Sequence, residues 1–150
     1  MLLLAMEKIT DLDSGIAEII AGLKFHHIGV ATESFEREIK AFSLLGYKVE
    51  GEPFEEPTQG MRGQFLVAPK QPRLELIENL PGSTMIDVFL KNKIKMYQIA
   101  YTVKDVVATT DALVQQRCRI ISPPTKSVTF GKMVSFLLLP NRMMIELIEE

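Results

Sequence analysis

The sequence consists largely of two similar halves, displaced from each other by 71 residues. The string Leu-Glu-Leu-Ile-Glu at 74–78 recurs as Ile-Glu-Leu-Ile-Glu at 145–149. Sliding the chain by this displacement, without gaps, aligns thirteen identical residues over positions 24–79. Chance would align about three or four at ordinary composition. Because 150 residues are about the length of one domain, the repeat predicts one domain built from two copies of a single structural unit.

Each half predicts the same order of elements. An alternating start, at 25–31 and at 96–103, predicts a strand. A helix follows, with Ser34 and Asp105 as N-caps at equivalent positions. Three short strands complete each half, at 47–50, 64–67 and 73–77 and again at 118–121, 133–138 and 143–149. We therefore expect an α+β fold with two tandem βαβββ modules.

The residues outside the repeat divide the chain further. Pro81 and Gly82 break it between the halves, and 83–91 predicts a short connecting helix. Near the start, apolar residues at largely helical spacing predict an N-terminal helical extension over 1–23 that packs on the sheet or on a second subunit; these residues are Ile9, Leu12, Ile16, Ile19, Ile20 and Leu23. The domain then covers 24–150, with modules at 24–80 and 94–150 and a connector at 81–93.

Composition excludes several classes of function. A net charge of −2 implies no basic face for nucleic acid. Cys118 is the single cysteine, which excludes a disulfide framework and a thiolate-rich zinc site. The sequence shows neither a signal peptide nor an apolar run long enough to span a membrane. We expect a cytoplasmic protein that binds neither nucleic acid nor membrane. The apolar N-terminal extension favours a homodimer.

Two pairs of polar residues occupy matching strand positions in the halves. His27 matches Gln98, and Glu75 matches Glu146. Each has apolar neighbours, where a charge is costly unless it is paired or coordinated. Two modules related by a pseudo-twofold axis bring such positions to one cleft, where an imidazole, two carboxylates and an amide oxygen can hold a divalent cation. The simpler alternative is a hydrogen-bonded strand histidine with no ligand role.

Three neighbours of these residues are expected to lie away from the site. His26 should face the opposite side of its strand from His27, because successive strand side chains alternate. Glu78 and Glu149, at the ends of their strands, are expected to be solvated.

The paired modules resemble the vicinal oxygen chelate superfamily. The likeness rests on the opening Phe25-His26-His27-Ile28-Gly29-Val30-Ala31 and the closing Ile145-Glu146-Leu147, and it extends over residues 24–149. Gln59-Gly60, the Glu-rich string at 74–78 and the connector at 83–91 are most similar to the methylmalonyl-CoA epimerase and glyoxalase I branch. The resemblance implies a curved mixed sheet around a central cleft.

The resemblance also implies a metal site and a chemistry. The metal ligands of that branch correspond to His27, Glu75, Gln98 and Glu146, and the metal would be Co, Ni, Mn, Zn or Mg. At the third position the branch usually has histidine, and glutamine is a weaker ligand. Epimerases can use a further carboxylate on the neighbouring strand, where this chain has Arg62-Gly63-Gln64. Ring-cleaving dioxygenase chemistry is disfavoured, because Gln98 breaks the two-histidine, one-carboxylate iron site.

Two functions follow from the resemblance. The first is a metal-dependent isomerase or lyase that removes a proton next to a carbonyl of a small 2-oxo or acyl-thioester substrate, with Glu146 or Glu75 as the base. The alternative is a non-catalytic protein that binds or sequesters a small molecule on the same fold. Four cationic residues are candidates for contacting an anionic substrate tail, although solvation explains them equally well: Arg62, Lys126, Lys132 and Arg142.

Overall fold

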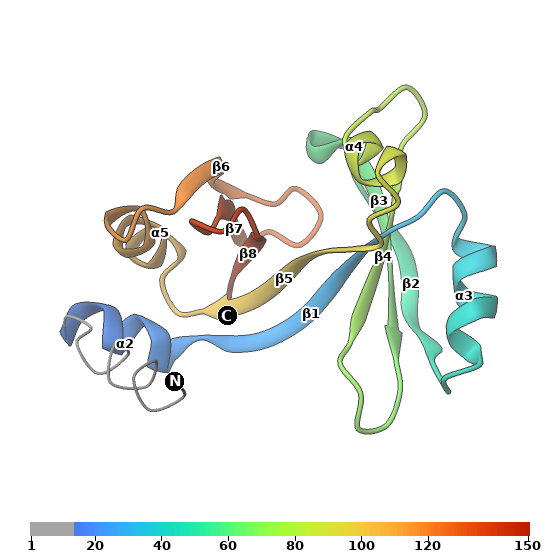
Figure 1. Cartoon of the computed structure of the whole chain (residues 1–150), viewed down its shortest axis with the longest axis horizontal. Coiled ribbons are helices and arrows are strands. Elements are labelled where there is room, and N and C mark those ends of the chain that lie inside the picture. Colours follow the sequence, from blue (N-terminus) through green and yellow to red (C-terminus); the bar gives the residue numbers. More distant parts are fainter. Residues whose placement is uncertain (1–13) are drawn as a thin grey trace.

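The protein folds around one eight-stranded sheet. The structure is a computed structural model, and it describes residues 14–150. The first half supplies β1 (Lys24–Ala31), β2 (Lys48–Glu56), β3 (Met61–Val67) and β4 (Leu74–Asn79), and the second supplies β5 (Met96–Val103), β6 (Arg119–Lys126), β7 (Met133–Leu138) and β8 (Met144–Glu149). Figure 1 shows β1 and β5 running through the middle of the molecule, between the half that carries α3 (Phe35–Ser43) and the half that carries α5 (Val106–Gln115).

The strand order repeats about the centre of the sheet. The order is β2-β3-β4-β1-β5-β8-β7-β6. The central pair β1 and β5 is antiparallel, whereas β1 pairs with β4 and β5 pairs with β8 in parallel. The two halves therefore have the same strand order when counted from the centre outwards. This arrangement confirms the α+β fold of two βαβββ modules in a curved mixed sheet.

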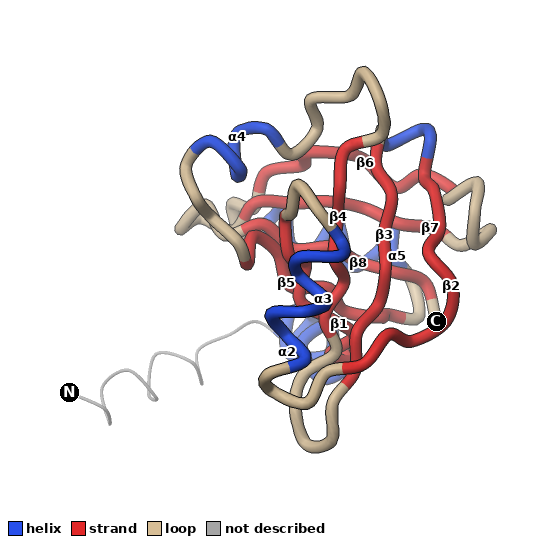
Figure 2. The backbone as a smooth tube through the Cα atoms, turned by 90° about the vertical axis from the view of Figure 1, so that its right-hand side faces the viewer, coloured by secondary structure: helices blue, strands red, loops and turns tan. Residues whose placement is uncertain are grey.

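The two main helices begin where the sequence predicts. Ser34 accepts a hydrogen bond from the backbone N–H of Arg37, and Asp105 accepts one from Ala108, at 3.3 and 2.9 Å. Both caps have extended backbone, as N-cap residues require. α3 packs against β2 and β4, and α5 packs against β6, β7 and β8. Seen from its own side, α3 lies in front of the sheet (Figure 2).

Equivalent residues form the core of each half. One core includes Phe35, Tyr47, Leu66, Leu74 and Leu76. The other uses the residues 71 positions later: Val106, Cys118, Leu137, Ile145 and Leu147. Cys118 is thus a packed residue, and its burial raises the pKa of the thiol. Because each helix covers the same side of its module, the repeat determines two small cores related by the pseudo-twofold axis.

Two segments differ from the sequence prediction. The connecting helix α4 covers only Asp87–Lys91. Before it the chain turns, and the Asn79 side chain accepts a hydrogen bond from Ile86 N–H. Strand β2 continues past the predicted end at 50, because its pairing with β3 resumes after a register shift between Glu50 and Phe54. Gly51, whose φ is 69°, lies at this irregularity. A glycine in a strand can mark a bulge, after which the strand continues, and not only a strand end.

The described part of the N-terminal extension packs within the chain. Helix α2 (Ser14–Gly22) contacts α5, with Ile16 buried, and Leu23 packs against the second core. Ile9 and Leu12 lie outside the described residues. Among residues 14–150, no helix has both the length and the apolar character needed to span a membrane.

Candidate metal centre

The four candidate ligands lie on the four central strands. His27 is on β1, Glu75 on β4, Gln98 on β5 and Glu146 on β8. The register brings them into adjacent rows: Gly29 pairs with both Glu75 and Gln98, and Ala100 pairs with both His27 and Glu146. All four side chains are buried. The sheet therefore places four polar side chains side by side in an otherwise apolar interior.

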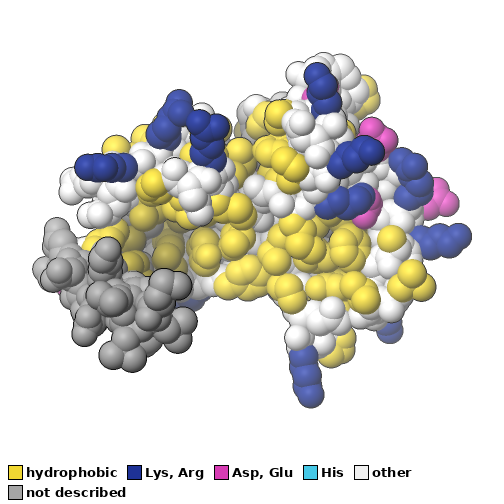
Figure 3. Space-filling model, viewed as in Figure 1, with side chains coloured by type: hydrophobic (Ala, Val, Ile, Leu, Met, Phe, Trp, Pro, Cys, Tyr) yellow, Lys and Arg dark blue, Asp and Glu magenta, His cyan; other side chains and the backbone are white. Residues whose placement is uncertain are grey.

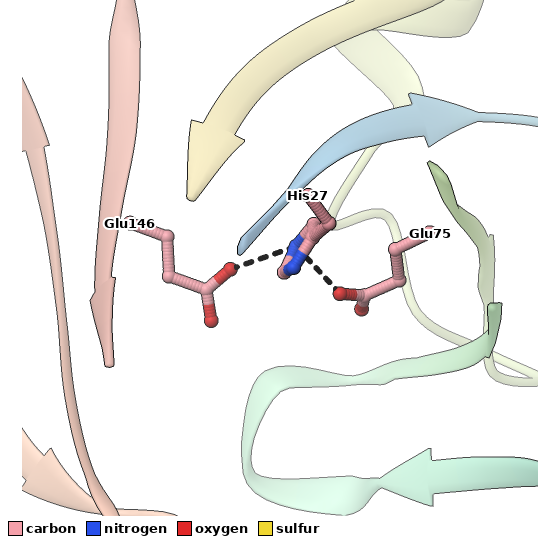
Figure 4. A group of neighbouring side chains, drawn as sticks. All are labelled: His27, Glu75 and Glu146. Atoms are coloured by element: carbon pink, nitrogen blue, oxygen red, sulfur yellow. Dashed lines mark ion pairs between the residues drawn. The ribbon is translucent and has the colours of Figure 1, made fainter. Parts of the chain in front are cut away.

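Three of them converge on one point. His27 Nε2 lies 2.7 Å from Glu75 Oε2 and 3.4 Å from Glu146 Oε2. Figure 4 shows the imidazole between the two carboxylates, which reach it from opposite sides. One ligand atom from each residue lies within 4.8 Å of the other two. An imidazole and two carboxylates at this spacing form a suitable donor set for a divalent cation.

Unpartnered buried atoms test whether a cation fits this group. Despite the short distances, His27 Nε2 forms no aligned hydrogen bond, and Gln98 Oε1 has no partner either. Gln98 turns its Nε2 towards Glu146 Oε2, at 3.1 Å. A rotation of the Gln98 amide by about 180° exchanges its N and O atoms. Oε1 can then face Glu146 Oε2 when a cation lies between the two oxygens. The donor set fits a divalent cation, because the cation would balance the two buried carboxylates and give Gln98 Oε1 the partner that the protein alone does not supply.

The expectation for His26 is wrong. Its ring lies 5.1 Å from that of His27, between centroids, and both rings line the same cavity. The cause is a register shift in the pairing of β1 with β5 between Phe25 and His27, which interrupts the regular alternation of side chains. The two Nδ1 atoms are 2.8 Å apart. When His27 Nε2 offers its lone pair to a cation, its Nδ1 carries the proton and donates a hydrogen bond to His26 Nδ1, which fixes the tautomer of the ligand.

Burial and neighbouring charges shift the pKa values at the site in different directions. Burial lowers the pKa of His27, but the carboxylates of Glu75 and Glu146 outweigh it and raise it to about 10. The pKa of Glu146 is raised, mainly by burial and partly by Glu75. The pKa of His26 falls to about 4, because burial acts together with the charges of His27 and Arg73. Without metal, the site therefore holds a proton between His27 and its carboxylates.

This proton makes the stability of the metal-free protein depend on pH. The pKa of His27 is about 10 in the folded protein, against 6.5 for a free histidine. The protonated His27 therefore stabilises the fold fully below pH 6.5, and this stabilisation is lost as the pH rises through 10. Between these two pH values the free energy of unfolding should fall by up to about 1.4 kcal/mol per pH unit, the value for one proton. Urea unfolding with a chelator present measures it, and His27→Gln should remove this slope. Equal slopes in both proteins would contradict the ion pair.

Two adjoining cavities reach the site. One, of about 260 Å³, is lined by His26, His27 and three phenylalanines together with Glu75 and Glu146; the other, of about 210 Å³, shares the two glutamates and is mainly apolar. Of the four cationic residues considered above, only Lys132 lines either of these cavities in the described residues. Arg62 instead stacks over the ring of Phe35, 4.5 Å from its centroid. Glu75 and Glu146 therefore lie between two mainly apolar cavities.

The sequence reasoning missed two residues of the larger cavity. Glu56 and Ser127 both line it, and Ser127 Oγ donates a hydrogen bond of 2.6 Å to Glu56 Oε1. They are 71 residues apart, so the displacement that paired the candidate ligands also pairs them. The sequence did not indicate this pair, because Glu56 lies beyond the predicted end of its strand.

Glu78 and Glu149 are not simply solvated. Glu78 accepts a hydrogen bond from the backbone N–H of Phe35, and Glu149 accepts one from Met133, at 2.8 and 2.9 Å. Both are partly buried. Glu78 thereby stabilises the positive end of α3.

Comparisons with known proteins agree on the architecture. Residues 26–136 match the model of the Glyoxalase/Bleomycin resistance protein/Dioxygenase superfamily. A hypothetical protein of Bacillus halodurans C-125 is 25% identical, with a TM-score of 0.71 over 85% of this chain and 94% of its own. Methylmalonyl-CoA epimerase from Mycobacterium tuberculosis is 23% identical, with a TM-score of 0.69 over 83% and 86%. A methylmalonyl-CoA epimerase in complex with methylmalonyl-CoA and an ammonium ion is 19% identical, with a TM-score of 0.65 over 85% and 94%. The sequence has no significant match among curated proteins.

Proposed function

Because the chain belongs to the Glyoxalase/Bleomycin resistance protein/Dioxygenase superfamily, we propose that it is a metal-dependent isomerase or lyase. It removes a proton next to a carbonyl of a small 2-oxo or acyl-thioester substrate. The observation that carries the proposal is the group of His27, Glu75 and Glu146, buried together where two cavities adjoin. Epimerases with this fold, one of them in complex with a coenzyme A thioester, support the choice of substrate class.

The proposed ligands are His27, Glu75 and Glu146, with Gln98 as a fourth through its amide oxygen. A bound divalent cation supplies Lewis acidity, which polarises a carbonyl and makes the neighbouring C–H bond more acidic. His26 holds the His27 ring through the contact between their Nδ1 atoms. Cobalt, nickel, manganese, zinc and magnesium are the candidate metals.

The same carboxylates provide a base. Burial raises the pKa of Glu146, which strengthens its carboxylate as a proton acceptor. Glu75 approaches from the other side and is the second candidate. The phenylalanine rings around the larger cavity, from Phe54, Phe65 and Phe130, exclude water from a carbanionic centre. Lys132 at the cavity wall offers a positive charge to an anionic substrate tail.

Metal content and hydrogen exchange test this function. The purified protein, loaded in turn with each candidate metal, should retain about one ion per chain by elemental analysis. The loaded protein in D₂O should introduce deuterium next to the carbonyl of acyl thioesters or hemithioacetals, followed by NMR. Glu146→Gln should lower this rate by about 10²–10⁴-fold, the usual contribution of a general base. Absence of metal binding would contradict the enzyme, and bound metal without exchange would favour the sequestration protein.

We also propose the domain division, the cellular location and the oligomeric state of the protein. The division into a helical extension over 1–23 and a domain over 24–150 stays a proposal, as do the cytoplasmic location and the homodimer. A single buried thiol agrees with a reducing compartment. Hydrophobic side chains gather across the middle of one face (Figure 3), which suits contact with a second copy. Light scattering of the purified chain measures the oligomeric state.

A further inference from the structure

The larger cavity, of about 260 Å³, and the smaller cavity, of about 210 Å³, are counterparts within the repeat. Four residues line both of them: Gln59, Met61, Glu75 and Glu146. Three pairs of residues 71 positions apart have their first member in the larger cavity and their second in the smaller one: His26 with Tyr97, His27 with Gln98, and Phe65 with Phe136. The pseudo-twofold axis therefore relates the two cavities, and a chemical difference between them indicates that they hold different parts of a ligand.

The two cavities differ in polarity at equivalent positions. The larger one has the imidazole of His26 where the smaller one has the ring of Tyr97. Lys132 lines only the larger cavity, and its equivalent is the apolar Met61. Among the described residues that line the smaller cavity, the two shared glutamates are the only charged ones. The larger cavity therefore suits the polar or anionic end of a ligand, and the smaller one suits an apolar group.

Helix α4 and the strands beneath it build an apolar wall for the smaller cavity. Phe89 of α4 stacks on Tyr97 of β5, with ring centroids 4.4 Å apart. Ile86, directly before α4, is buried, and Asn79 accepts a hydrogen bond from its backbone N–H. Three methionines complete much of the wall: Met61, Met85 and Met144. Because methionine side chains are flexible and polarisable, they can adapt to hydrocarbon groups of different shape.

The smaller cavity has room for more than a methyl group. Its volume is about 210 Å³, whereas an apolar cavity of about 150 Å³ is enough to hold benzene. Met85, Val88 and Ile121 line this cavity and are also exposed. A single exposed apolar side chain is normal, but a group of them around a cavity is typical of a binding groove. A hydrocarbon chain can therefore fill the cavity and continue over an apolar rim.

The smaller cavity borders the candidate metal group directly. Glu75, Gln98 and Glu146 all contribute to its lining. A substrate whose carbonyl lies at this group has its neighbouring substituent beside the cavity. Filling an apolar cavity with hydrocarbon removes that hydrocarbon from water, which raises affinity by about fourfold for each methylene group that is fully buried.

We propose that the substrate carries, next to the reacting carbonyl, an apolar substituent of about six carbon atoms, which binds in the smaller cavity. A hexyl chain and a phenyl ring are examples. This inference rests on the proposed function, because it takes the reacting carbonyl to lie at the metal group. The thioester or other polar end then lies in the larger cavity, with Lys132 at its wall. Such a substituent is larger than the methyl group of methylmalonyl-CoA, the ligand of one of the relatives.

Straight-chain acyl thioesters of a single thiol test the proposal. The metal-loaded protein is titrated calorimetrically with the propanoyl, butanoyl, hexanoyl and octanoyl thioesters of coenzyme A, which differ only in the length of the chain beyond the α-carbon. The affinity should rise by about fourfold for each added methylene group that becomes buried. An affinity that does not change along the series would overturn the proposal.

Two variants locate the effect in the smaller cavity. Ser122 lines it from the edge strand β6 and is partly exposed, so Ser122→Leu should fold and fill part of the space. The octanoyl thioester should then bind about tenfold or more weakly, while the propanoyl thioester binds as to wild type. Val88→Glu places a charge at the mouth and should weaken octanoyl binding by about fourfold or more. Val128→Glu is the matched control, because Val128 is exposed and lines neither cavity.

Metal content and deuterium exchange separate this proposal from the proposed function. All three variants should retain the same amount of metal as wild type. Equal losses of propanoyl and octanoyl affinity in Ser122→Leu, or equal effects of Val88→Glu and Val128→Glu, would overturn the assignment of the smaller cavity. A wild-type protein whose affinity rises with chain length, but which exchanges no α-hydrogen of these thioesters in D₂O, would support the cavity assignment and overturn the enzyme.

Discussion

His27→Ala is expected to lose at least about 100-fold in affinity for Co²⁺ or Ni²⁺, because even residues that only orient a ligand cost 10–100-fold when removed. The imidazole is the only nitrogen donor in the buried group of described residues, and cobalt and nickel favour such donors. Removing it leaves Glu75 and Glu146 facing each other without a positive partner. Isothermal titration of the metal-free protein measures the affinity, and circular dichroism checks that the variant is folded.

Two variants define the scale of this loss. His26→Ala keeps all proposed ligands but removes the contact at His27 Nδ1, so an intermediate loss of about 10–100-fold is expected. Glu55→Gln changes an exposed carboxylate outside the site and should leave the affinity unchanged. A folded His27→Ala protein with wild-type affinity would show that the group is a structural ion-pair cluster.

Leu76→Ala and Leu147→Ala should each lower the free energy of unfolding by about 2–5 kcal/mol, the usual cost of truncating a buried leucine. The two side chains are fully buried, at equivalent positions in the two cores. Because each lies next to a glutamate of the metal group along its strand, the cavity left behind should also loosen that ligand. Urea denaturation measures the loss in the metal-free protein, and repeating it with metal measures the effect on binding.

The exposed leucine at 44 provides the matched control. Leu44 is 87% exposed at the end of α3, so Leu44→Ala should change stability by no more than about 0.5 kcal/mol. A loss confined to one of the two core variants would contradict the view that the halves have equivalent cores.

Sequence alone determined the features that depend on the repeat. A displacement of 71 residues implies two equivalent modules. The superfamily match and the strand order confirm these two modules. The same displacement selected His27 with Gln98 and Glu75 with Glu146, and the structure brings these four side chains together. Such features can be predicted because equivalent residues must occupy equivalent places whatever the details of the fold.

Only the tertiary structure decided which other side chains join the site. A register shift in the pairing of β1 with β5 turns His26 inwards, and no local pattern reveals a shift that arises between strands far apart in sequence. Glu56 reaches the cavity because the edges of the curved sheet meet through Ser127. The amide of Gln98 likewise takes its orientation from Glu146. These placements depend on long-range pairing and closure of the sheet, so the repeat could supply the ligands but could not show which further groups face them.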